Sequence, residues 1–342
     1  MKNIFSFALT SIAMSFTAQA FEPLPANPPI PADNPMTAAK IELGKQLFFD
    51  PRLSIDGTIS CNSCHNVMSS GTDNRSVSVG VAGAKGGRSA PTVWNAAFLS
   101  AQFWDGRAAT LEDQAKGPIL AHVEMAMPSA DAAVKRIKSI PGYVQSFKAV
   151  FAGEDPVTYD NMAKAIATYE RTLITPNSPF DRYMRGDKTA MTDQAVRGMK
   201  TAESVGCTSC HNGPNFSGPA LPAGTPFLQK FPTYSGSSYE KKYDLASDLG
   251  RYGVTKDASD KNMWRVPTWR NVAITAPYFH NGKVETLSEA IRVMAKTQLN
   301  KDLSNKQVAD IEAFLHSLTG EFPVQTFPRL PDYAFSSIVE ID

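Results

Sequence analysis

The residues best suited to chemistry are two copies of the pattern C-x-x-C-H. Residues 61–65 read C-N-S-C-H, residues 207–211 read C-T-S-C-H, and together they use all four cysteines of the 342-residue chain. Two cysteines at this spacing, on about one turn of helix, can add to the two vinyl groups of one haem, and the next histidine can ligate its iron. The pattern predicts two covalently bound c-type haems. Their attachment residues are Cys61, Cys64 and His65 for the first haem, and Cys207, Cys210 and His211 for the second.

Other chemistries of cysteine fit the pattern less well. A thioredoxin-like C-x-x-C is expected in a β-α-β setting, which the surrounding sequence does not suggest. A zinc site built from both motifs is open on ligand type alone. A disulfide framework would place cysteines elsewhere in the chain, and there are none.

The first twenty residues predict export. Lys2 is followed by an apolar run over residues 4–16 and then by Ala18-Gln19-Ala20, the small-x-small pattern of a signal peptidase site. We expect residues 1–20 to be a signal peptide, Phe21 to begin the mature chain and the protein to reach the bacterial periplasm; a buried N-terminal helix is the alternative. No later stretch reaches the roughly 20 apolar residues of a membrane span.

The charge balance excludes some partners. The chain has 34 Lys and Arg residues and 33 Asp and Glu residues, and removal of Lys2 with the signal peptide leaves the two equal. A neutral chain without a basic run is a poor binder of nucleic acid or of a membrane surface. Any charged docking surface must therefore be a local patch.

The helices that would position the two motifs also occur twice. Apolar residues at helical spacing precede each motif, over 36–49 and 192–205, and mark a closing helix after each, over 162–173 and 308–318, with Gly320 as the expected C-cap of the last. Long Gly- and Pro-rich stretches lie between. We predict an all-α fold of two cytochrome c-like haem domains, related by internal duplication and carrying long Gly/Pro-rich loops. The expected division is 21–180 for the N-terminal domain and 181–342 for the C-terminal domain.

Several longer stretches resemble the bacterial dihaem cytochrome c peroxidases. They are residues 90–125, which include F-W-D-G-R and end in H-V-E-M, together with residues 155–166, 270–283 and 290–299. The resemblance covers nearly the whole mature chain. It implies that hydrogen peroxide binds at the N-terminal haem and is reduced to water. The two electrons would come from a small cytochrome c or copper protein and enter at the C-terminal haem. It also implies a homodimer.

The resemblance assigns roles to individual residues. Met294, in A-I-R-V-M-A-K-T-Q-L, matches the methionine opposite His211 on the electron-accepting haem, and thioether ligation raises a haem's potential. A related family, similar to the tryptophan-modifying dihaem enzyme of methylamine dehydrogenase maturation, has tyrosine there. Glu124 matches the acid-base residue over the peroxidatic iron, and Gln114 the neighbouring amide that orients peroxide. Trp104 matches the tryptophan between the two haems.

Calcium is a further implied cofactor. Thr275 and Pro277 match positions whose carbonyls bind an interdomain Ca²⁺ in the family. The family's third contributor is an asparagine, and this chain has Ser89 instead.

The sharpest departure from the family is Val81, in S-V-G-V-A-G-A-K-G-G-R. Many members carry here a histidine that caps the oxidised peroxidatic iron, and valine cannot ligate iron. Of the other histidines, only His122 is near the first site in sequence, whereas His280 belongs to the second half and His316 to the closing helix. We expect a first haem without a protein cap, open to peroxide when oxidised, beside a mobile Gly-rich loop over 80–87.

Two other functions use the same cofactors. A dihaem electron carrier or redox sensor would need no proton shuttle at Glu124, and a dihaem oxidase would act on another substrate at the open iron. The predicted activity is cytochrome c peroxidase, and these two remain alternatives.

Overall fold

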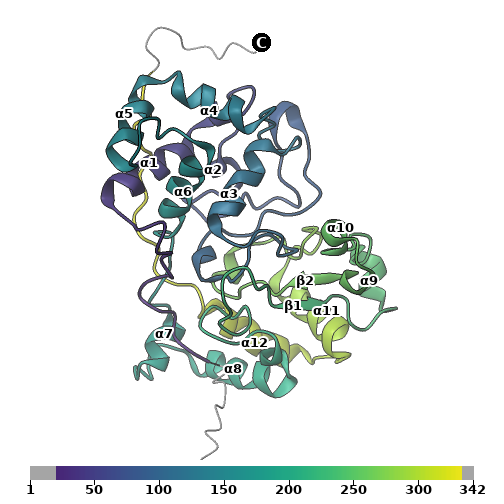
Figure 1. The fold of residues 1–342 in the computed structure, drawn as a ribbon. Coiled ribbons are helices and arrows are strands. Elements are labelled where there is room, and N and C mark those ends of the chain that lie inside the picture. The colour runs from purple at the N-terminus through teal and green to yellow at the C-terminus, as the bar shows by residue number, and fades with distance from the viewer. Residues whose placement is uncertain (1–20, 333–342) are drawn as a thin grey trace, which may run out of the picture.

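The computed structural model describes residues 21–332. The predicted signal peptide lies outside the described residues. Helices α1–α6 gather into a first lobe, whereas α7–α12 and a small sheet form a second lobe (Figure 1). The α-helices are α1 (Ala38–Phe49), α2 (Cys61–Cys64), α3 (Leu111–Leu120), α4 (Ala130–Lys138), α5 (Pro141–Val150), α6 (Tyr159–Glu170), α7 (Pro179–Met184), α8 (Asp193–Val205), α9 (Ser238–Tyr243), α10 (Tyr252–Thr255), α11 (Leu287–Leu299) and α12 (Asn305–His316). The short 3₁₀ helices are η1 (Pro51–Leu53), η2 (Val81–Gly83), η3 (Ala96–Phe98), η4 (Cys207–Ser209), η5 (Ala258–Asp260) and η6 (Val272–Ile274).

The fold is mostly helical, but the prediction of an all-α fold was wrong in one detail. Strands β1 (Leu228–Lys230) and β2 (Met263–Arg265) pair antiparallel, with Gln229 opposite Trp264. Strands of three residues are too short for an alternating pattern to be visible in a sequence. Within residues 21–332, no helix combines the length and the apolar character needed to cross a membrane.

The predicted position of one helix end was also wrong. Helix α12 ends at His316 with Ser317 as its C-cap, so Gly320 is not the cap. A Cβ atom on Gly320 would lie 1.9 Å from the carbonyl oxygen of Thr175. This glycine permits a close approach of two backbone segments, which the sequence pattern of a single helix cannot reveal.

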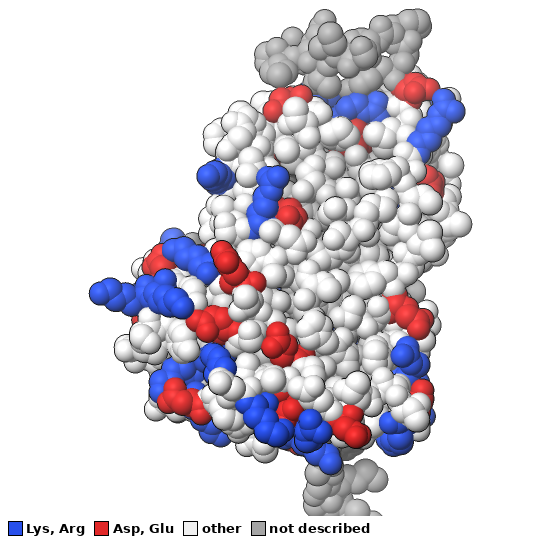
Figure 2. Space-filling view, turned by 180° about the vertical axis from the view of Figure 1, so that it is seen from behind, with Lys and Arg blue, Asp and Glu red and all other residues white. Residues whose placement is uncertain are grey.

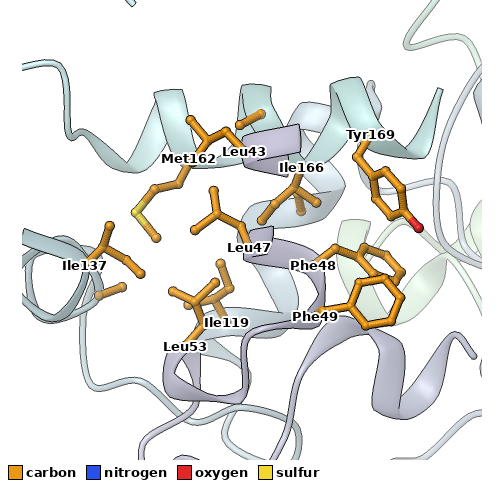
Figure 3. Close-up of a cluster of buried hydrophobic side chains, with 14 of the residues drawn as sticks. Leu43, Leu47, Phe48, Phe49, Leu53, Ile119, Ile137, Met162, Ile166 and Tyr169 are labelled. Carbon is orange, nitrogen blue, oxygen red and sulfur yellow. The ribbon is translucent and has the colours of Figure 1, made fainter. Parts of the chain in front are cut away.

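The core of the first lobe forms where α1 crosses α6. Thr37 and Thr158 cap the two helices with their side-chain oxygens, and Leu43 and Leu47 of α1 pack beside Met162 and Ile166 of α6 (Figure 3). A Cβ on Gly44 of α1 would lie 1.8 Å from the carbonyl oxygen of Ala165 and 3.1 Å from the Cβ of Tyr169. The helices therefore touch backbone to backbone at this glycine.

The second lobe contains the same kind of crossing. Helices α8 and α12 pack together, and a Cβ on Gly198 would lie 1.7 Å from the carbonyl oxygen of Asp310 and 2.9 Å from the Cβ of Phe314. In each lobe the contacted residues are four apart on the closing helix. The helices that precede and follow each C-x-x-C-H motif are thus held in contact by a glycine.

We predict that Gly198→Ala lowers the free energy of unfolding by about 1–3 kcal/mol, because the added methyl overpacks the crossing. Chemical denaturation of the purified protein measures this. Gly253→Ala is the matched control, since Gly253 lies in α10 and a Cβ there would have no atom within 4 Å. Equal stability of the two variants would contradict the backbone contact.

The terminal segments cross between the lobes. Phe21, at the start of the described chain, packs against Phe180, Phe216 and Phe314 in the core of the second lobe. At the other end, residues 320–332 return along the first lobe, where Phe327 meets Phe49 with ring centroids 5.4 Å apart (Figure 1). Each lobe is therefore completed by a segment that belongs to the opposite end of the chain.

Charged side chains are unevenly spread over the surface. On the face shown in Figure 2, the second lobe carries lysines and arginines interspersed with acidic residues, whereas the middle of the molecule is largely uncharged. This mixture agrees with the balanced composition of the chain.

Candidate haem and peroxide site

The first C-x-x-C-H motif forms a short helix with an oriented histidine. Ser60 and Ser63 make a capping box around α2, and the His65 N–H donates to the Cys61 carbonyl at 2.9 Å. The His65 Nδ1 lies 3.0 Å from the carbonyl oxygen of Pro91. A carbonyl only accepts, so Nδ1 carries the proton and the Nε2 lone pair is left to bind a metal.

The second motif is arranged in the same way. The Nδ1 atom of His211 lies 3.1 Å from the carbonyl oxygen of Phe216, and its ring stacks on Trp269 with centroids 4.3 Å apart. Burial lowers the pKa of His211 to about 4, so its ring is neutral near pH 7. Both histidines are thus held as neutral ligands with Nε2 unprotonated.

The chemistry of the two sites fits haem better than the alternatives. All four cysteines are free thiols, and burial raises the pKa of the Cys61 and Cys207 thiols rather than favouring the thiolates that zinc requires. No group of three or more His, Cys, Asp or Glu side chains among residues 21–332 is arranged to hold a metal ion.

Two buried ring nitrogens also fit a haem group. Trp264 Nε1 and His280 Nε2 have no hydrogen-bond partner within the described part of the chain, and the two rings stack 4.2 Å apart. Haem carries two carboxylates, which are acceptors of the kind that buried donors need.

Val81 and Glu124 lie together. The N–H of Val81 donates to the Glu124 carbonyl at 2.9 Å, and a Cβ on Gly80 would lie only 2.2 Å from the Val123 carbonyl oxygen. The side chain of Val81 is buried and that of Glu124 half-buried. Burial raises the pKa of Glu124, and the nearby Arg107 guanidinium lowers it. The start of the Gly-rich loop is therefore fastened to the turn that carries the predicted acid-base residue.

Gln114 lies on α3, whose C-terminal end supports the same turn. The N–H groups of Met125 and Met127 donate to the carbonyls of Pro118 and Ile119, at 3.2 and 2.9 Å. The structure thus brings the elements that carry Gln114 and Glu124 together. The described contacts include no hydrogen bond between the two side chains.

Trp104 lies at the junction between the lobes. Its indole N–H donates to the Ser89 carbonyl at 2.8 Å, and its own carbonyl accepts from the Arg265 N–H at 2.9 Å. The ring is partly buried against the core of the second lobe. Its location between two haems stays a prediction.

The segments of the predicted calcium site lie close together as well. The Ser89 N–H donates to the His280 carbonyl at 2.7 Å, and Asn74 Nδ2 donates to the carbonyls of Ile274 and Ala276 at 3.2 and 2.7 Å. Thr275 and Pro277, whose carbonyls are the predicted calcium ligands, each directly follow one of these two residues, Ile274 and Ala276, in the sequence. Calcium at this place stays a prediction.

Of the remaining candidate residues, one is partly buried and two are exposed. Met294 lies on α11 and is partly buried against the core of the second lobe. His122 is exposed beside Glu124, and His316 is exposed at the end of α12.

An ion-pair chain connects the lobes, and no single sequence motif predicts it. Arg88 binds Asp105 at 2.6 Å and Asp248 at 2.7 Å, and Asp105 also binds Arg107 at 3.0 Å. Arg88 further lies over the Trp264 ring, 4.8 Å from its centroid. The chain runs from Arg107, which lies near Glu124, through Asp105 and Arg88 to the stacked rings of Trp264 and His280. The only local signal was the D-G-R that follows Trp104.

Comparisons with known proteins decide the family. Residues 38–189 match the model of the di-haem cytochrome c peroxidase family. The chain is 46% identical to the cytochrome c551 peroxidase of Pseudomonas aeruginosa, over 91% of this chain and 87% of that protein. It is 42% identical to the cytochrome c551 peroxidase of Nitrosomonas europaea, over 97% of this chain and 96% of that protein.

The chain belongs to the dihaem cytochrome c peroxidase family. It is accordingly an oxidoreductase of the peroxidase type, and the family uses two haems. Its fold is also similar to the crystal structure of a MauG-like protein associated with microbial copper homeostasis. That match has a TM-score of 0.75 and 29% identity, and it covers 90% of this chain and 96% of the other.

Proposed function

We propose that the protein is a periplasmic peroxidase that reduces hydrogen peroxide to water with two electrons from a small cytochrome c or a copper protein. Cys207, Cys210, His211 and Met294 would hold the C-terminal haem, which would accept the electrons. Cys61, Cys64 and His65 would hold the N-terminal haem, and Trp104 would lie on the electron path between the two. When bound, the two haems supply the electron transfer and the open iron that peroxide needs.

The placement of Glu124 carries this proposal. A half-buried carboxyl with a raised pKa lies in the first lobe, where the backbone of Val81 fastens its turn to the loop. Such a group can accept the proton from one peroxide oxygen and return it to the departing oxygen. Gln114 would orient peroxide by hydrogen bonds. A pure electron carrier has no use for this arrangement.

The test is steady-state oxidation of a reduced small cytochrome by peroxide, using the purified holoprotein. Mass spectrometry of the same sample should show two covalent porphyrin adducts. Rapid peroxide-dependent oxidation supports the peroxidase. An absence of turnover with both haems present would favour the carrier or sensor, and turnover with another reductant alone would favour the oxidase.

The division into two duplicated domains is part of the proposal. It is supported by the glycine crossings at Gly44 and Gly198, which join the helices before and after each motif in the same way. We place the domains at residues 21–180 and 181–342, after a signal peptide at 1–20. Met294 distinguishes the chain from the related tyrosine-ligated enzymes. A homodimer and a Ca²⁺ ion at Ser89, Thr275 and Pro277 complete the proposal.

The first haem is proposed to need no reductive activation, because Val81 cannot ligate iron. Fully oxidised wild-type protein should show one high-spin haem and turn over without a lag. Val81→His should introduce a lag and lower the initial rate of the oxidised protein by about tenfold or more, which corresponds to about 1.4 kcal/mol in favour of a capped state. Stopped-flow absorbance measures both.

Val81→Leu is the matched control, since leucine is apolar and has no ligating atom. It should keep the immediate turnover of the wild type. Two low-spin haems and a lag in the oxidised wild-type protein would show that another residue caps the iron, with exposed His122 as the first to examine.

A further inference from the structure

A buried carboxyl in the first lobe has no role in the reaction described so far. Glu170 is the last residue of α6, and its side chain is only 5% exposed. Its Oε2 atom has no hydrogen-bond partner among the described residues. A buried carboxylate without partners is costly, so its presence requires an explanation.

The second lobe shows what a purely structural residue would be at this position. Gly44 meets Ala165 and Tyr169 of α6, whereas Gly198 meets Asp310 and Phe314 of α12. Ala165 of α6 therefore corresponds to Asp310 of α12, and Tyr169 corresponds to Phe314. The next residue of each helix gives the pair Glu170 and Leu315. Leu315 is 4% exposed and belongs to the core of the second lobe. The first lobe therefore has an acid where the second lobe has leucine.

Glu170 lies near the attachment point of the first haem. Burial, and then the nearby Glu170 carboxylate, raise the pKa of the Cys61 thiol on α2. Cys61 packs against the same core as α6 (Figure 3 shows Tyr169, the neighbour of Glu170, in this core).

Glu170 forms no ion pair with any of residues 21–332. Arg171, next to it on α6, is bound to Glu112 of α3 by two hydrogen bonds of 2.7 and 3.1 Å. From α1, the carboxylate of Glu42 acts on the neighbouring Tyr169. Burial raises the pKa of Glu170 to about 8, Arg171 lowers it and Glu112 raises it. The carboxyl is therefore protonated at neutral pH.

A polar path leads from this region toward solvent. Glu112, the partner of Arg171, accepts from Asn34 at 2.7 Å, and Asn34 donates further to the carbonyl of Lys164 at 3.0 Å. Lys164 pairs with the exposed Asp33. The surroundings of Arg171, the sequence neighbour of Glu170, are therefore polar up to the surface, and no described hydrogen bond joins this chain of contacts to the Glu170 carboxyl.

We propose that Glu170 is a proton-binding site coupled to the redox state of the first haem. In alkaline solution, where Glu170 is ionised while this haem is oxidised, the carboxylate takes up one proton from solvent when the haem gains one electron, and it releases the proton when the electron leaves. The reason is electrostatic: each added electron places a negative charge near a buried carboxyl, which favours the neutral acid. The inference rests on the proposed attachment of the first haem at Cys61 and Cys64, but not on peroxide turnover.

The test is a potentiometric titration of the holoprotein, followed by visible absorbance at a series of pH values on both sides of 8. The potential of the first haem should fall with rising pH across this window, by up to about 59 mV per pH unit, which is a tenfold change in proton concentration converted for a one-electron couple. The potential of the second haem, with Leu315 in the equivalent place, should not show this step.

Glu170→Gln keeps the size of the side chain and removes the titration, and Glu170→Leu copies the second lobe. Each should abolish the pH-dependent step, and the exposed Glu154→Gln should retain it. Infrared difference spectra of reduced and oxidised protein should show a carboxylic-acid band that is lost in Glu170→Gln. A flat potential in the wild type, or a step that persists in Glu170→Gln, would overturn the proposal. Neither result depends on the peroxidase assay.

Discussion

Glu124→Gln is expected to lower the rate of peroxide reduction by about 10²–10⁴-fold, the usual contribution of one general acid-base group. Glutamine keeps the shape of the side chain but cannot accept a proton. The Val81 N–H binds the backbone carbonyl of residue 124, so the substitution leaves that contact in place. Haem content and visible spectra should be unchanged, and steady-state oxidation of the reduced cytochrome measures the loss.

The pH profile gives a second measure of the same residue. Glu124 must be ionised to act as a base, so activity is lost as the pH falls through its pKa. Burial raises this pKa, so the loss should occur at a higher pH than for an exposed carboxyl. Glu154→Gln, at an exposed site in the same lobe, is the control and should keep wild-type activity. If Glu124→Gln keeps both the rate and the profile, another group moves the proton.

The haem motifs were predictable because their information is local. Each C-x-x-C-H motif lies within one turn, and the structure adds only the carbonyl that holds each histidine, from Pro91 in one case and Phe216 in the other. The helices around the motifs were also predicted from spacing, as the bounds of α1 and α8 confirm. In both cases a short window of sequence contains the whole signal.

The contacts between distant segments were not predictable in this way. Arg88 gives no sign in the sequence that it will bind Asp105 and Asp248 together, because the pairing depends on how the lobes meet. Glu170 follows a buried tyrosine at a position where the pattern alone suggests a solvated charge. Only the comparison of the two helix crossings shows that its side chain replaces a core leucine.

The second large prediction concerns the ion pair between Arg270 and Asp181. Among residues 21–332 it is the only ion pair whose two side chains are both fully buried. Arg270 and Asp181 lie 2.8 Å apart, and each side chain is 0% exposed. Asp181 also accepts from the N–H of Leu24 at 2.9 Å, which fastens the N-terminal segment to the second lobe. Asp181→Ala should lower the free energy of unfolding by about 3–5 kcal/mol, because it leaves the Arg270 charge buried without its partner.

Denaturant unfolding of the oxidised holoprotein measures this loss, and Asp181→Asn separates charge from shape. Asparagine keeps most of the volume but not the charge, so it should still lose much of the stability. The matched control is Asp155→Ala, which removes an exposed partner of Lys138 and should cost less than about 1 kcal/mol. A small effect of Asp181→Ala would mean that water reaches Arg270 when its partner is removed. The ion pair and the contact with Leu24, both of which Asp181→Ala removes, would then add little to the stability at this place.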